Sequence, residues 1–200
     1  MQILTVDIGT GTQDIHLLDT RLGIDNAFKM ILPSPTMIVR REIEQATRRG
    51  DAVLLTGVMM GGGPCQWAAE AHLRSGLRLF ATPDAGRTFN DDLDWVRREM
   101  GVQIVSADDA ARMGDVRRIA LRDLDLPGIR RVFDSFGVEF APAALGVAVF
   151  DHGNAPPSVS DRQFRFDYLA DRIRAHNRLT AFAYPADDIP PAMTRMLAVV

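Results

Sequence analysis

Short apolar runs alternate with turn residues over the first part of the chain. Ile3–Val6 and Ile15–Leu18 are two such runs, and a third covers 27–32 before the breaker Pro33-Ser34-Pro35. Each run has the length of a strand, and no helical period precedes Pro35. Because strands joined by short links pair antiparallel, the pattern predicts three consecutive antiparallel strands within residues 2–32.

After the third run, helical and strand patterns alternate. Val39, Ile43 and Ala46 predict a helix that ends before Gly50, and the fully apolar segment 52–56 is typical of a strand buried on both faces. Further helices are expected over 64–75, 89–100, 107–113 and 129–136, and further strands over 77–81, 102–105, 118–121 and 145–150. The alternation predicts an α/β fold with a mixed sheet, in which the later strands run parallel and helices cover both faces. The strand at 52–57 is expected to pair parallel with the first.

The last part of the chain is less regular. Residues 154–160 form a loop rich in Pro and Ser, Phe164 and Phe166 indicate a strand that leads into a helix, and 180–184 indicates a last strand. We therefore expect one domain over 1–153 and an extension or linker over 154–200.

The loop between the first two runs is the strongest candidate for a ligand site. Two glycines give it backbone freedom and let a ligand approach the main chain closely. Successive amides in such a turn bind anions, typically phosphate oxygens, and hydroxyl groups add donors. The candidate ligand-binding residues are Gly9, Thr10, Gly11 and Thr12.

Two carboxylates flank this loop. Asp7 ends the first run and Asp14 follows the loop. A carboxylate beside a bound phosphate repels it unless a cation lies between them, so both residues are candidate Mg²⁺ ligands, and Asp7 is also a candidate catalytic residue. A tight hairpin without ligand, with Asp14 capping the turn, is the alternative.

The segment Val6-Asp7-Ile8-Gly9-Thr10-Gly11-Thr12 resembles the first phosphate motif of the sugar kinase, heat-shock 70 and actin superfamily. Together with Leu54-Leu55-Thr56-Gly57-Val58-Met59-Met60-Gly61-Gly62-Gly63-Pro64, it is similar to an uncharacterised family grouped with actin-like ATPases and often labelled pyruvate formate-lyase activating enzyme. The resemblance implies a ribonuclease H-like fold, Mg-ATP as ligand and a second lobe, and we expect this chain to stop short of that lobe.

A second glycine cluster follows the strand at 52–56 and leads into a helix. The start of a helix offers unpaired amides to an anion, which makes Gly61, Gly62 and Gly63 candidate cofactor-binding residues. Close packing against the first loop explains these glycines equally well. Cys65, next in the helix, is either a thiol with a lowered pKa or a buried, inert residue.

Asp151 and His152 follow the apolar strand at 145–150. Ligands of open α/β sheets gather at the carboxyl ends of strands, so either residue is a candidate catalytic base. In the alternative, Asp151 caps a turn and His152 lies on the surface.

Composition and charge limit the classes of partner and the cellular location that we expect. A net charge of −3 and 7% aromatic residues give no reason to expect nucleic acid. No apolar run reaches the roughly 18 residues of a membrane span, and no signal-peptide pattern precedes the first strand. The single Cys fits a reducing cytoplasm and argues against an iron–sulfur cluster, which several thiolates hold, and so against the activity in the family label.

The sequence therefore predicts a cytoplasmic protein that binds a nucleotide or another phosphorylated small molecule, with ATP and Mg²⁺ as expected cofactors. As an enzyme it would be an ATP-dependent phosphotransferase or ATPase. The alternative is a non-catalytic binding or assembly module of the same fold. The oligomeric state stays open, a homodimer included.

Overall fold

The computed structural model describes residues 1–59, 62–151, 153–156 and 159–199. The chain forms two compact units, Met1–Ala148 and Val149–Val200. The first unit is an α/β structure that contains a four-stranded mixed sheet and a four-stranded parallel sheet. No helix within the described ranges combines the length and apolar character needed to cross a membrane.

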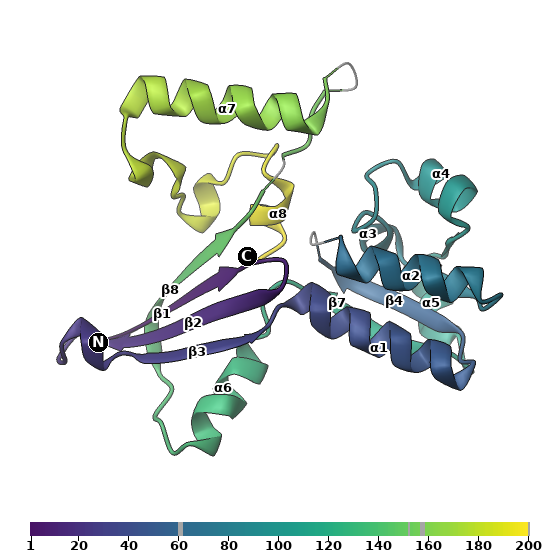
Figure 1. The fold of residues 1–200 in the computed structure, drawn as a ribbon, viewed down its shortest axis with the longest axis horizontal. Coiled ribbons are helices and arrows are strands. Elements are labelled where there is room, and N and C mark those ends of the chain that lie inside the picture. The colour runs from purple at the N-terminus through teal and green to yellow at the C-terminus, as the bar shows by residue number, and fades with distance from the viewer. Residues whose placement is uncertain (60–61, 152, 157–158, 200) are drawn as a thin grey trace. The chain divides into compact units, whose positions relative to one another are not determined.

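The first sheet has the strand order β3-β2-β1-β8. Its strands are β1 (Gln2–Ile8), β2 (Thr12–Asp19), β3 (Phe28–Pro33) and β8 (Pro142–Val149). The pairs β1–β2 and β2–β3 are antiparallel, which confirms the three predicted strands. A three-residue 3₁₀ turn, η1 (Ile24–Asn26), lies in the link before β3. Figure 1 shows β8 running in the same direction as β1, which makes the sheet mixed.

The two faces of this sheet differ in character. Leu4, Val6 and Ile15 are buried on one face, where helix α6 (Leu126–Ser135) packs. The Phe133 ring of α6 lies 6.3 Å from the Phe28 ring and 5.4 Å from the Phe140 ring, measured between centroids. Because strand side chains alternate between faces, the polar residues of β1 and β2 lie together on the opposite, open face.

The second sheet has the order β6-β5-β4-β7, and its strands pair parallel. They are β4 (Val53–Val58), β5 (Leu79–Ala81), β6 (Gln103–Ile104) and β7 (Arg117–Arg122). The predicted pairing of β4 with β1 is therefore wrong. β4 lies between β5 and β7, while β1 lies between β2 and β8, so neither strand has a free edge for the other.

Helices cover both faces of the second sheet (Figure 1). One core contains the predicted stripe of helix α1 (Pro35–Arg49), namely Val39, Ile43 and Ala46, together with residues of α2 (Pro64–Arg74). On the other face, Leu54 and Phe80 pack with Ala110 of α5 (Ala107–Arg112). The predicted helix at 89–100 is shorter and irregular: α3 (Pro83–Gly86) precedes it, and it consists of α4 (Leu93–Trp95) and a π-helical turn, η2 (Val96–Met100).

The second unit is helical in the residues that are described. Its elements are α7 (Asp161–His176), η3 (Leu179–Phe182), η4 (Ala186–Asp188) and α8 (Thr194–Leu197). The strands predicted around Phe164 and over 180–184 are wrong, because α7 includes the former and a 3₁₀ turn occupies the latter. Phe164 stacks on Tyr168 one helical turn later. Phe164 and Phe166 also alternate with polar residues, which is why the sequence indicated a strand here.

Candidate functional site

The hairpin loop between β1 and β2 is held from one side by Ser34. The Ser34 hydroxyl donates to the Thr10 carbonyl at 2.6 Å, and the Ser34 N–H donates to the Gly11 carbonyl at 3.1 Å. In a trans peptide the C=O and the following N–H point in opposite directions. The N–H groups of Gly11 and Thr12 therefore both point away from Ser34. Within the described residues, the Gly11 N–H reaches no acceptor.

The two loop glycines have different reasons to be glycine. Neither adopts a positive φ, so neither uses the left-handed conformation that favours glycine. A Cβ on Gly9 would lie 3.0 Å from the Thr12 carbonyl oxygen, which the 2.9 Å hydrogen bond from the Gly9 N–H to the same oxygen holds close. A Cβ on Gly11 would meet nothing within 4 Å. The fold does not require glycine at position 11, and its absent side chain leaves the outward amides open.

Two carboxylates face each other beside this loop. Asp7 and Asp14 are directly opposite in the β1–β2 register, on the open face of the sheet. Like charges in such a pair destabilise a sheet, so a cation between them would be favourable. In the described part of the chain, no three His, Cys, Asp or Glu residues come close enough to hold a metal ion. Mg²⁺ suits this pair because it usually keeps several waters and takes only one or two carboxylates.

The same face is hollowed next to the acidic pair. A cleft of about 570 Å³ is lined by Asp7, Asp14 and His16, and on the β8 side by Gly146 and Ala148. The small side chains of β8 leave this space open, and polar side chains of β1 and β2 line its other side. From the sequence, His16 has no partner at metal-ligand spacing and is expected to be structural, although its place two residues after Asp14 puts it on the same face of a strand.

The second glycine segment packs against the first loop. The Thr36 hydroxyl donates to the Gly62 carbonyl at 2.7 Å and accepts from the Cys65 N–H at 3.1 Å. A Cβ on Gly63 would lie 3.8 Å from Thr10 Cγ2, and Gly63 has φ +51°. A Cβ on Gly62 would lie 3.1 Å from the Thr88 carbonyl oxygen.

These contacts favour the packing explanation for Gly62 and Gly63. Gly61, the third glycine of this segment, lies outside the described residues.

The first turns of two helices adjoin the loop. α1 and α2 begin with Pro35 and Pro64, and neither has a side-chain cap or an acidic residue in its first turn. The start of a helix carries a partial positive charge. The segment before α2 also follows the carboxyl end of β4, where the strand order reverses between β5 and β7. Ligands of open α/β sheets bind at such reversals.

The candidate catalytic base at the end of β8 has another role. Asp151 belongs to the second unit, and both of its carboxylate oxygens accept backbone hydrogen bonds, from the Gly153 N–H and the Met196 N–H, each at 2.8 Å. These bonds support the alternative in which Asp151 caps a turn, and they also join the two ends of the unit. His152 lies outside the described residues.

Cys65 is buried in the first turn of α2. Burial raises the pKa of its thiol to about 12, which supports the alternative of a buried, inert residue over a thiol with a lowered pKa. A thiol that does not ionise is a poor nucleophile and a poor metal ligand.

We expect the purified protein to contain no stoichiometric iron or acid-labile sulfide, because one buried thiol cannot supply the several thiolates of a cluster. Metal analysis and a sulfide assay check this. Iodoacetamide should leave Cys65 unmodified in the native protein at pH 8 and alkylate it in urea. Stoichiometric iron with sulfide, or rapid native alkylation, would contradict the structure.

A protein-family profile described as "Putative pyruvate formate-lyase activating enzyme (DUF1786)" matches residues 60–200. No curated protein matches the chain.

Proposed function

This chain belongs to the DUF1786 family, and we propose that it binds a phosphorylated ligand, Mg-ATP, through the hairpin loop Gly9–Thr12. The observation that carries the proposal is the anchoring of the loop by Ser34, which turns the N–H groups of Gly11 and Thr12 to the same side. Two successive N–H groups on one side form the concavity that binds anions. The open space at Gly11 admits a phosphate to them.

The other groups around the loop support the same ligand. Asp7 and Asp14 would hold Mg²⁺ through one or both carboxylates and its water, and the ion would neutralise the phosphate charge beside them. The first turns of α1 and α2, which contain no acidic residue, add positive potential. The strand–Asp-x-Gly-Thr–strand arrangement supports assignment to the actin-like ATPases with a ribonuclease H-like fold. The described strands form two separate sheets, whereas the resemblance predicts one mixed sheet.

The activity in the family description does not fit this chain. An iron–sulfur activating enzyme needs several thiolates, whereas the chain has one Cys, which is buried with a raised pKa.

If the protein is an enzyme, its reaction is phosphoryl transfer or ATP hydrolysis in the cytoplasm. The loop amides would hold the phosphate oxygens, and Asp7 would position the ion. A non-catalytic binding or assembly module is the second candidate. It is favoured by Asp151, whose two oxygens are already occupied by Gly153 and Met196 and are poorly placed to accept a proton.

Titration of the protein with ATP, with and without Mg²⁺, tests the proposal. We expect weak binding and negligible turnover, and Mg²⁺ should strengthen the binding by about tenfold, which corresponds to about 1.4 kcal/mol. Asp7→Ala should reduce this Mg²⁺ effect to about twofold or less, since the ion then loses a ligand while phosphate still meets the amides. Calorimetry of both proteins measures it.

Asp7 is exposed on the open face, and Asp7→Ala removes its repulsion from Asp14, so the variant should melt at the wild-type temperature or slightly above it. Asp25→Ala is a matched control, since Asp25 is an exposed carboxylate in η1. Normal Mg-ATP binding by Asp7→Ala would place the site elsewhere, and robust turnover would contradict the non-catalytic candidate.

A further inference from the structure

A second cleft opens at the amino ends of the parallel strands. It has a volume of about 750 Å³ and is lined by the segments that precede β4, β5 and β7. The candidate nucleotide loop adjoins the carboxyl end of β4, so the second cleft lies at the other end of this sheet. Three arginines from separate segments line it, Arg49, Arg78 and Arg117.

Many arginines outside the cleft have local partners. Seven of the ion pairs join an arginine to a carboxylate three or four positions away, among them Arg40–Glu44, Arg87–Asp84 and Arg112–Asp109. Such surface pairs partly neutralise each other. Arg49 and Arg117 have no such partner: within the described residues, neither side chain forms an ion pair, a hydrogen bond or a ring contact. A few other arginines, Arg98 among them, share this lack, but Arg49 and Arg117 line one cleft.

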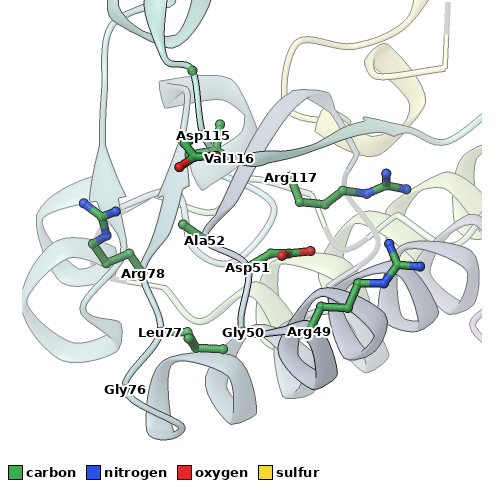
Figure 2. Close-up of a pocket in the computed structure, with 11 residues that line it drawn as sticks. Arg49, Gly50, Asp51, Ala52, Gly76, Leu77, Arg78, Asp115, Val116 and Arg117 are labelled. Atoms are coloured by element: carbon green, nitrogen blue, oxygen red, sulfur yellow. The ribbon is translucent and has the colours of Figure 1, made fainter.

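The carboxylates in the cleft form no ion pair with these arginines. Asp51 and Asp115 line the same cleft, yet none of the ion pairs among the described residues includes either one. Figure 2 shows the side chains of Arg49, Asp51 and Arg117 extending toward one side, and that of Arg78 toward the other. Arg78 lies over the Phe80 ring, with its guanidinium carbon 5.5 Å from the centroid. On the side to which Arg49 and Arg117 extend, two guanidinium groups lie beside the one carboxylate of Asp51, which leaves that side positive.

The helix ends explain only part of this arrangement. α1 ends at Arg49, and the negative end of a helix attracts cations, which accounts for Arg48 and Arg49. It does not account for Arg117, which begins strand β7. The helix end also opposes an anion, so a ligand has to be bound by the guanidinium groups themselves.

The lining indicates the chemistry of the ligand. Gly50, Gly76 and Gly114 present bare backbone, and a Cβ on any of the three would meet nothing within 4 Å. Such a surface offers a ligand little apolar area, and guanidinium groups bind phosphate oxygens through paired hydrogen bonds. We propose that this cleft is a second anion site that binds a small phosphate-bearing molecule between Arg49 and Arg117. This proposal is independent of the hairpin loop.

Amide NMR of the whole chain with inorganic pyrophosphate tests the proposal. We expect the signals of Gly50, Gly76 and Gly114 to shift and saturate. The double variant Arg49→Gln/Arg117→Gln should weaken this binding by about tenfold or more, because both guanidinium groups are lost. Binding by Arg49→Lys/Arg117→Lys should be intermediate between the wild type and the Gln variant, since lysine keeps the charge and loses the paired hydrogen bonds.

Arg98→Gln is the matched control, because Arg98 is exposed and lies outside the cleft. It should bind pyrophosphate like the wild type. The proposal would be overturned if the signals of the cleft glycines did not shift, or if the double variant bound pyrophosphate as the wild type does. An equal loss of binding in Arg98→Gln would also overturn it. The Gly11 signal reports separately on the hairpin loop, so failure of one site is distinguishable from failure of the other.

Discussion

Gly57→Ala is expected to destabilise the first unit by about 3 kcal/mol or more, a large part of a typical domain's stability. Gly57 lies in β4 with φ +82°, and a Cβ there would lie 2.3 Å from the backbone carbonyl oxygen of Leu121. That oxygen belongs to the paired strand β7, so it cannot move without breaking the sheet. Urea unfolding followed by tryptophan fluorescence measures the effect, because Trp67 and Trp95 both lie in the first unit.

Gly76→Ala separates backbone strain from the steric clash. Gly76 has φ +77°, but a Cβ there would meet nothing within 4 Å. We expect only the strain of a left-handed residue, about 1–2 kcal/mol. Equal losses in the two variants would show that the close approach of β4 and β7 is not the reason for glycine at position 57.

Gly11→Val is expected to weaken Mg-ATP binding by about tenfold or more, while the free energy of unfolding changes by no more than about 0.5 kcal/mol. The branched side chain would occupy the open space beside the outward N–H groups of Gly11 and Thr12. Since φ at position 11 is not positive, valine meets no left-handed strain there. Calorimetric titration and urea unfolding of the same preparation give both quantities.

Gly23→Val is the control for this variant. Gly23 is an exposed loop residue with φ −65°, and a Cβ there would meet only Asn26, at 3.8 Å. It should bind Mg-ATP as the wild type does. If Gly11→Val also binds normally, the loop amides do not hold the phosphate. A marked loss of stability in Gly11→Val would contradict the open space at this position.

The sequence predicted the elements that depend on neighbouring residues. β1, β2 and β3 follow one another through short links, so the apolar runs were enough to identify their antiparallel order. The stripe of Val39, Ile43 and Ala46 likewise predicted the buried side of α1. Local periodicity contains this information because each contact depends on spacing within one element.

Contacts between distant segments explain what was missed. Periodicity identifies a strand but not its neighbour, so the sequence could not show that β7 and β8 take the edges of β4 and β1. The conformation of Gly11 depends on Ser34, and the need for glycine at position 57 depends on Leu121. In the candidate site, the hairpin order brought Asp7 and Asp14 together as expected, whereas Asp151 acquired its role from Met196.

The order of the strands along the chain has a consequence for synthesis on the ribosome. The first sheet is built from residues 2–33 and 142–149, and the whole second sheet lies between these segments in the chain. After β3 has left the ribosome, the apolar face of β1 and β2 stays uncovered until α6, which begins at Leu126, has been synthesised. At cellular rates of synthesis that delay is roughly ten seconds. The nascent hairpin therefore presents Leu4, Val6 and Ile15 to solvent or to chaperones until the inserted sheet has been made.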